Sequence, residues 1–347
     1  MNKTCCGCVA DSQPVMVSGV YRSGTTFLSA LVGAHTLFRA SSSTVKFLRF
    51  CRDRYDEINL LENRRRLVTD TQRRIKVRWD IDIDSEAILD AAQKCSDLSY
   101  ACLYDIIMRE MLTDRPEQRW VEKLAVQWRD IPVFLDMFPR GKALHIFRDV
   151  RDVAASYKNM TFEPGYTYLD AAFNFLDANR TLENLDKNYG DRIRVVKAEE
   201  IAADPLKQTK AICDFLEVEF EPQMLDFRQL CAVGEDWASN TSYEIPYQKL
   251  PDGKPRWPKQ LSRSEVIFLE MVSQPYLNEL GYVASNYYPS ADDWSDIYRY
   301  IEDPTLKERL IGWLTKGEGA QGYRTDPYIR EMALVFPERF GSNVMEE

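Results

Sequence analysis

Residues 19–26 read Gly19-Val20-Tyr21-Arg22-Ser23-Gly24-Thr25-Thr26, and this stretch decides the fold. Its two glycines have the G-x-x-x-x-G spacing of a phosphate-binding loop. The apolar run Pro14–Val20 before it predicts a buried strand, and Gly24–Ala34 after it predicts a helix. Backbone N–H groups and the helix dipole hold an anion at such a helix start. We therefore expect an anion to bind at Arg22, Ser23, Gly24, Thr25 and Thr26.

The position of the cation in this loop favours one class of anion. A loop that hydrolyses nucleoside triphosphates carries Lys directly after the second glycine, where this chain has Thr25. The cation is instead Arg22, inside the loop. A phosphosulfate carries fewer charges than a triphosphate, so amides, hydroxyls and one cation hold it without a metal ion. A nucleoside or small-molecule kinase is an alternative, which Thr25 disfavours.

The rest of the chain alternates short apolar runs with helical patterns. Further strands are expected at Arg119–Leu124, Ala143–Phe147 and Arg192–Lys197. Helices are expected at Thr44–Arg78, Asp84–Lys94, Tyr100–Leu112, from Pro132, and at Val150–Asn159, Tyr168–Lys187, Pro205–Leu216 and Ser262–Leu280. This alternation predicts an α/β fold, with a parallel sheet covered by helices on both faces.

The chain is divided into three parts on the same grounds. Residues 1–13 are expected to be a disordered tail, and residues 14–284 to form one domain with helical insertions. Residues 285–347 are expected to add a C-terminal helical extension packed on that domain. The turn-rich segment from about Cys231 to Gln260 predicts a long functional loop.

A second candidate phosphate site follows the predicted strand Ala143–Phe147. It reads Arg148-Asp149-Val150-Arg151-Asp152-Val153-Ala154-Ala155-Ser156 and opens a helix. The guanidinium of Arg148 and the hydroxyl of Ser156 would both reach one phosphate. Taken alone, the same residues are equally explained as a capped helix with surface ion pairs.

The two motifs together resemble the sulfotransferases that use 3′-phosphoadenosine 5′-phosphosulfate (PAPS), over about Pro14 to Ala284. Weaker resemblances lie at Glu122-Lys123, Phe138–Ala143, Glu200–Pro205, Gly253–Trp257 and Leu261-Ser262. The resemblance implies a P-loop-like fold in which Arg22–Thr26 hold the 5′-phosphosulfate. It also implies that Arg148 and Ser156 hold the 3′-phosphate, and that Lys254 and Trp257 belong to a loop closing over the nucleotide. Arg22 would lie over the transferring sulfonate and Lys123 beside the acceptor, as the two catalytic residues.

The general base of that family has no counterpart in the sequence. No histidine follows Lys123, where the chain reads Leu124-Ala125-Val126-Gln127-Trp128, and no Glu lies in Arg39–Thr44. Of the two histidines, His35 follows a helix and His145 lies in an apolar strand, so structural roles are expected for both. A carboxylate is the alternative base, from Asp80, Asp82, Asp84 or Glu86, although Asp84 also fits a helix N-cap.

Two further groups of residues have competing interpretations. The basic cluster would draw in an anionic acceptor, but a solvated helix face is the preferred interpretation; its members are Arg64, Arg65, Arg66, Arg73, Arg74, Lys76 and Arg78. The loop aromatics would stack on adenine, wall an acceptor pocket, or simply pack under the loop; they are Trp237, Tyr243, Tyr247 and Trp257.

Composition limits the remaining possibilities. The 347 residues carry 45 Lys and Arg against 54 Asp and Glu, a formal net charge of -9, which argues against a nucleic-acid partner. The sequence has no apolar run of membrane-spanning length and no signal-peptide pattern, so no membrane association and a cytoplasmic location are expected. Cys5 and Cys8 form a C-x-x-C pair without further zinc ligands, and all eight cysteines are expected to be reduced thiols.

These observations lead to one function and its alternatives. The expected function is transfer of sulfonate from PAPS to a hydroxyl or amine of a small-molecule acceptor by in-line displacement, without a metal. A catalytically weak nucleotide-binding protein of the same fold is the alternative besides the kinase. Neither the acceptor nor the oligomeric state follows from the sequence.

Overall fold

Five parallel strands form the centre of the protein, which a computed structural model describes over residues 9–41, 45–95, 98–159, 165–226, 253–316 and 327–340. The spatial order is β2 (Phe38–Ser41), β3 (Arg119–Lys123), β1 (Val15–Gly19), β4 (Lys142–Phe147) and β5 (Ile193–Lys197). The strand before the phosphate loop is therefore the middle one, paired with β3 on one side and β4 on the other. The predicted α/β fold with a parallel sheet is confirmed.

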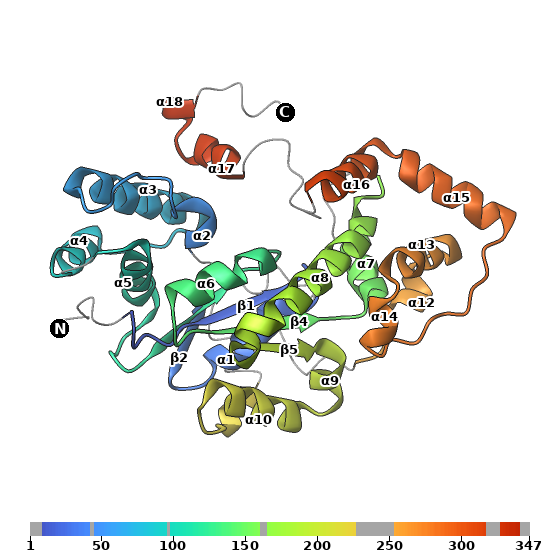
Figure 1. Ribbon diagram of the computed structural model, residues 1–347, viewed down its shortest axis with the longest axis horizontal. Helices are drawn as coiled ribbons and strands as arrows, with labels where there is room; N and C mark the ends of the chain where they lie inside the picture. Colours follow the sequence, from blue (N-terminus) through green and yellow to red (C-terminus); the bar gives the residue numbers. More distant parts are fainter. Residues whose placement is uncertain are drawn as a thin grey trace.

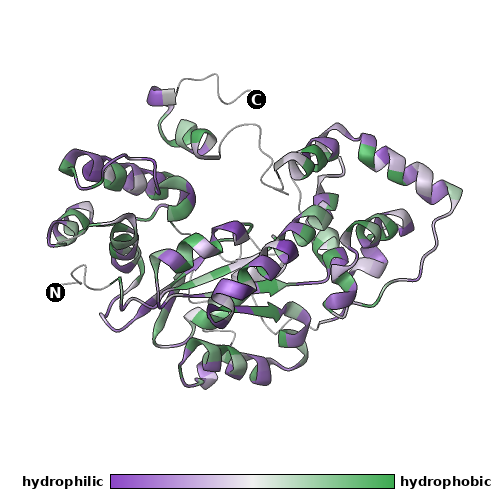
Figure 2. Ribbon diagram, in the orientation of Figure 1, coloured by the Kyte–Doolittle hydropathy of each residue, from purple (hydrophilic) through white to green (hydrophobic). Residues whose placement is uncertain are grey.

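Helices cover both faces of this sheet (Figure 1). On β1, Val15 and Val17 point to one face, where they pack with α1 (Thr25–Gly33), α9 (Ala198–Ala203) and α10 (Pro205–Leu216). Met16 points to the other face, toward α6 (Ile131–Met137) and α8 (Ala171–Tyr189). The central strand β1 is buried at every position, whereas the edge strand β5 has exposed and charged residues, so the sheet in Figure 2 has both green and purple segments.

Two predicted helices are each divided in the structure. The pattern over Thr44–Arg78 forms α2 (Phe47–Phe50) and α3 (Leu61–Trp79), separated by turns. The stretch Ser262–Leu280 forms α13 (Arg263–Ser273) and α14 (Tyr276–Glu279), because Pro275 cannot supply the N–H that a continuous helix needs. The expected capping box of Ser262 and Glu265 is present.

The remaining helices build two lobes beside the sheet. One lobe adds α4 (Ser85–Gln93) and α5 (Tyr100–Leu112) to α2 and α3, and the other lobe contains α7 (Val150–Lys158), α12 (Trp257–Gln260) and α13 to α16. After α15 (Ala291–Glu302) and α16 (Pro304–Lys316), α17 (Pro327–Val335) contacts α3 and α2, and α18 (Pro337–Phe340) contacts α17. Figure 1 shows α17 near α3 and away from α16. The C-terminal segment thus contacts both lobes.

Some expectations about the termini and cysteines change. Ser12 is buried and donates to Asp105 Oδ1 at 2.6 Å, so the part of the predicted tail that is described is ordered. Cys95 is in a disulfide, against the expectation of reduced thiols, whereas the described cysteines Cys51, Cys102 and Cys213 are free. Cys5, Cys8, most of the predicted loop and its residues Trp237, Tyr243 and Tyr247 lie outside the described residues.

Candidate active site

The phosphate loop crosses from β1 to α1 at the carboxyl edge of the sheet. Gly19 has no room for a side chain, because a Cβ there would lie 2.7 Å from the Ile146 carbonyl oxygen. Gly24 has φ 106°, a left-handed conformation in which a side chain would be strained. Arg22 also has positive φ, at 66°, so the loop turns sharply on either side of the buried Ser23. Both glycines of the sequence motif are therefore required by the backbone.

The N-terminus of α1 is arranged for an anion. Gly24 occupies the N-cap position without a side-chain cap, and the first turn contains no acidic residue. The first amides of a helix have no partner inside it, so this end presents donors and a positive dipole toward the loop. Thr25 and Thr26 add hydroxyls at the same end. The structure thus places Ser23, Gly24, Thr25 and Thr26 together at one helix start.

Lys123 reaches this helix start from the end of β3. Its Nζ donates to Thr26 Oγ1 at 3.2 Å. Burial, together with the nearby Lys46 and Arg22, lowers the pKa of Lys123 to about 8. Mutual repulsion of this kind falls when an anion binds between the cations.

Lys46 is a residue that sequence reasoning missed. It precedes α2 with φ 47°, and its backbone N–H donates to Glu122 Oε1 at 2.7 Å. Burial lowers its pKa to about 8, as do Arg49 and Arg74. No local motif surrounds Lys46, so only the pairing of β2 with β3 brings it near Lys123.

The second motif meets the phosphate loop directly. Arg148 follows β4 and Ser156 lies on α7. Arg22 Nε donates to Ser156 Oγ at 3.2 Å, and Arg148 donates to the Arg22 backbone oxygen at 3.4 Å. The two predicted anion sites are therefore adjacent and share Arg22.

Other residues of the second motif hold the helix in place. Asp149 caps α7 by accepting from the Arg151 backbone N–H, and its carboxylate is also bound by the Arg151 guanidinium. Arg151 donates further to Glu270 at 2.5 Å, which ties α7 to α13. The backbone N–H of Asp149 donates to Glu199 in α9, the helix that follows β5. Burial of Asp149 and Arg151 thus serves the scaffold rather than a ligand.

Residues 253–256, which lead into α12, are attached to α7 by Asp152. Oδ1 of Asp152 accepts from the backbone N–H groups of Arg256 at 2.8 Å and Trp257 at 3.0 Å. The Trp257 ring lies 4.3 Å from the guanidinium of Arg151. Lys254 is exposed in the same segment. Trp257 is therefore brought to the second motif.

The two histidines lie away from this edge. His145 is fully buried beside Trp128 and Phe147, and burial lowers its pKa to about 3. The ring nitrogens of His35 contact the Glu219 carbonyl at 2.9 Å and the Leu37 N–H at 3.0 Å. Both rings occupy the structural positions expected from their sequence context.

The four candidate carboxylates are engaged near the end of α3. Lys76 Nζ contacts Asp80 at 2.7 Å and Asp82 at 2.8 Å. Asp84 caps α4, as expected, and Glu86 pairs with Arg65 at 3.0 Å. None of these contacts involves a residue of the two predicted anion sites.

The basic cluster on α3 is solvated in part, as the preferred interpretation held, because Arg65, Arg66, Arg73, Lys76 and Arg78 are exposed. Arg64 and Arg74 are buried. Glu331 of α17 pairs with Arg74 at 3.6 Å and with Arg78 at 3.3 Å, and Glu338 pairs with Arg73 at 2.6 Å. Three members of the cluster, Arg73, Arg74 and Arg78, therefore form ion pairs with α17 and α18.

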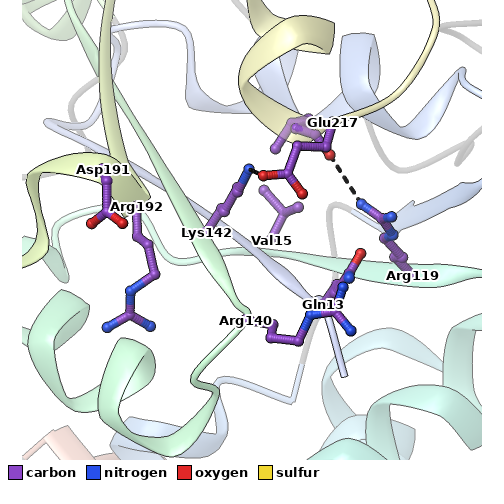
Figure 3. Close-up of a pocket in the computed structure, with 9 residues that line it drawn as sticks. Gln13, Val15, Arg119, Arg140, Lys142, Asp191, Arg192 and Glu217 are labelled. Carbon is purple, nitrogen blue, oxygen red and sulfur yellow. Dashed lines mark hydrogen bonds and ion pairs between the residues drawn. The ribbon is translucent and has the colours of Figure 1, made fainter. Parts of the chain in front are cut away.

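A second group of cations lies at the amino edge of the sheet, around the pocket in Figure 3. Arg119 and Lys142 begin β3 and β4, and Arg192 immediately precedes β5. Lys142 pairs with Glu217 at 2.8 Å, and Arg119 donates to the Leu216 carbonyl at 3.0 Å. This group is thus separated from the phosphate loop by the length of the strands.

Comparison with known proteins identifies the family of the chain and supports its fold. A family model described as the sulfotransferase family matches residues 14–222. An uncharacterized protein of Aquifex aeolicus (strain VF5) is 22% identical over 224 residues, which are 62% of this chain and 27% of that relative. The chain therefore spans about a quarter of the length of that curated relative.

Two solved sulfotransferase domains share the fold. The domain from the Synechococcus PCC 7002 olefin synthase has a TM-score of 0.51 at 18% identity, covering 76% of this chain and 95% of its own. The domain from the curacin biosynthetic pathway has a TM-score of 0.50 at 16% identity, covering 78% of this chain and 98% of its own. At this level of identity, the likeness concerns the fold.

Proposed function

Because the chain belongs to the sulfotransferase family, we propose that it transfers the sulfonate group of PAPS to a hydroxyl or amine of a small-molecule acceptor. The observation that carries this proposal is the contact of Arg22 with both Ser156 and Arg148. This contact places the two proposed anion sites next to each other. PAPS carries anionic groups on both the 3′ and the 5′ side of its ribose, so one molecule of it would occupy both sites. No helix in the described part of the chain is long and apolar enough to span a membrane.

The residues present fit this nucleotide. The uncapped start of α1 with Arg22 suits the phosphosulfate end, and Arg148 with Ser156 suits the 3′-phosphate. Trp257, held by Asp152, offers an aromatic surface beside the second site, and Lys254 adds a cation in the same segment. When bound, PAPS supplies the sulfonate group that is transferred.

Arg22 and Lys123 are the proposed catalytic residues. In an in-line displacement, negative charge builds on the bridging and equatorial oxygens, and fixed cations stabilise it most effectively where water is excluded. Lys123 is half-buried at Thr26, and Arg22 is fixed through Ser156. Both cations are therefore held at the loop before any ligand arrives.

A second candidate function is nucleotide binding without catalysis. It is favoured by the placement of His35 and His145, since neither ring faces the phosphate loop. An acceptor that is acidic or already nucleophilic needs little help from a base, so the absence of a histidine there does not exclude transfer.

Calorimetry and a transfer assay separate these functions. We expect 3′,5′-ADP to bind and ATP to bind much more weakly; the reverse order would favour the kinase. We then expect transfer of label from PAPS to members of a mixed panel of phenols, alcohols and amines. Binding of 3′,5′-ADP without transfer to any panel member would favour the binding protein.

A further inference from the structure

Tyr21, the phosphate-loop residue directly before Arg22, contacts two helices. The centre of its ring lies 4.5 Å from that of Tyr157 on α7, next to Ser156, which accepts from Arg22. Its hydroxyl accepts from Asn174 Nδ2 on α8 at 3.4 Å. The phosphate loop is therefore held by α7 through a ring and a hydroxyl, and by α8 through a buried amide.

Asn174 is itself held by Asp170, which ends the turn Thr167–Asp170 before α8. Asn174 Nδ2 donates to the Asp170 carbonyl oxygen at 3.1 Å and to Asp170 Oδ1 at 3.3 Å. Both side chains are fully buried. A buried amide keeps the orientation that satisfies its hydrogen bonds, so Asp170 determines where the amide of Asn174 points.

The cation that balances Asp170 comes from α16, beyond the residues 14–222 that the family model matches. Arg309 Nη1 donates to Asp170 Oδ2 at 2.9 Å, and the pair is largely buried. Burial raises the pKa of Asp170 to about 7, while Arg309 and Asn174 act in the opposite direction. Without Arg309 the carboxylate would be a buried charge that has lost its cation, which is costly.

We propose that Arg309 and Asp170 hold Asn174 so that it positions Tyr21, and that α16 thereby controls how the phosphate loop presents Arg22 to the transferring group. The proposal rests on the function proposed above, because it takes Arg22 to act on that group. The three positioning residues are largely or fully buried, so they act through Tyr21 rather than on a ligand. A cation displaced by a small distance loses much of its effect on a transition state.

Hydrogen exchange of the protein without nucleotide tests the positioning directly. Tyr21→Phe removes only the hydroxyl that accepts from Asn174, and Arg309→Met removes the cation. We expect the backbone amides of residues 19–26 to exchange about two- to tenfold faster in both variants, as the loss of one hydrogen bond implies. Arg309→Lys keeps the charge and should show a smaller increase. Arg299→Met, which removes an exposed ion pair on α15, is the matched control and should leave these amides unchanged.

Turnover with labelled PAPS tests whether this position matters for transfer. Tyr21→Phe and Asn174→Leu should each lower kcat about two- to tenfold, with a smaller change in the Kd for 3′,5′-ADP. The double variant should lose no more than either single variant, because both substitutions remove the same hydrogen bond. Amides of α5, in the other lobe, should exchange as in the unmodified protein, which shows that each variant is folded.

The outcomes distinguish this proposal from the function on which it rests. If 3′,5′-ADP fails to bind the unmodified protein, the proposed function is wrong, and hydrogen exchange still decides whether Arg309 positions the loop. If exchange of residues 19–26 stays unchanged in Tyr21→Phe or in Arg309→Met, the positioning is wrong and the function stands. Losses of kcat that multiply in the double variant, or a loss of nucleotide affinity at constant kcat, would also overturn it.

Discussion

The two edges of the sheet both gather cations, but they use them differently. At the amino edge, Lys142 and Arg119 donate to carbonyls at the end of α10, and Arg192 donates to the Leu135 carbonyl in the last turn of α6 and to the Pro139 carbonyl after it. At the carboxyl edge, Arg22 and Lys123 contact hydroxyls and repel each other. The partners of a cation therefore indicate whether it serves the fold or a ligand.

The direction of the helices explains this difference. In a parallel sheet with crossover helices, helix C-termini lie at the amino edge and helix N-termini at the carboxyl edge. Cations at the amino edge are stabilised by the negative ends of the dipoles and by unpaired carbonyls. Cations at the carboxyl edge lie beside positive dipole ends, so an external anion is their most favourable partner.

The largest effect is expected for Arg22→Ala. Its guanidinium is proposed to stabilise charge on the transferring group, so turnover should fall by about 10²–10³, more than nucleotide affinity changes. Initial rates with labelled PAPS and titrations with 3′,5′-ADP measure the two quantities. Arg140→Ala, at the amino edge, is the matched control and should leave turnover unchanged. A loss confined to nucleotide binding would make Arg22 a clamp only.

The next effect concerns the second anion site. Arg148→Ala and Ser156→Ala each remove a partner worth about 1–3 kcal/mol, so the Kd for 3′,5′-ADP should rise roughly 5- to 150-fold. Calorimetry measures the affinity, and thermal unfolding checks that each variant is folded. Unchanged affinity in both variants would show that the second motif only caps a helix.

A smaller effect, on stability alone, is expected for Lys142→Met at the amino edge. Loss of the Glu217 ion pair and of the contact with the end of α10 should reduce the free energy of unfolding by about 0.5–1 kcal/mol. Lys142 holds the pKa of Glu217 below its ordinary value, so this part of the stability is present near neutral pH and lost as the pH falls. Denaturant titrations at two pH values test this. A change in 3′,5′-ADP affinity would contradict the division between the edges.

The smallest effect on turnover is expected for His35→Gln and His145→Gln. Both rings are buried away from the loop, so each variant should lose far less than the ~10²–10⁴ that removal of a general base costs. A hundredfold loss in either variant, with nucleotide affinity and stability preserved, would identify a histidine base.

His145 also predicts a pH dependence of stability. Burial holds its pKa near 3 in the folded protein, below the value of about 6.5 in an unfolded chain. The unfolded chain therefore binds the proton first, and stability is lost as the pH falls from about 6.5 toward 3. Thermal unfolding between pH 7 and pH 4 should show a shallower decline for His145→Gln than for the unmodified protein. Equal slopes would contradict the burial of the neutral ring.

The sequence by itself indicated four of the five strands of the parallel sheet, all but β2, and the two motifs that are proposed to bind anions. Each motif is a strand, a turn and a helix in continuous sequence, so glycines, hydroxyls and arginines are specified locally. The role of Trp257 beside the nucleotide stays a prediction from the resemblance of Gly253–Trp257 to a loop of the sulfotransferase family. The hydrogen bond from the Trp257 backbone N–H to Asp152 could not be predicted from sequence, because it joins residues of two separate segments.

Only the tertiary structure decided what surrounds those motifs. The backbone of Lys46 is brought to Glu122 of β3, and Arg74 of α3 is buried where Glu331 of α17 pairs with it. Sequence periodicity describes one element at a time, so it could not show that α17 would pair with Arg74. The paired charges come from distant segments, as for Arg73 and Glu338, which are 265 residues apart, and their pairing depends on packing that no single segment encodes.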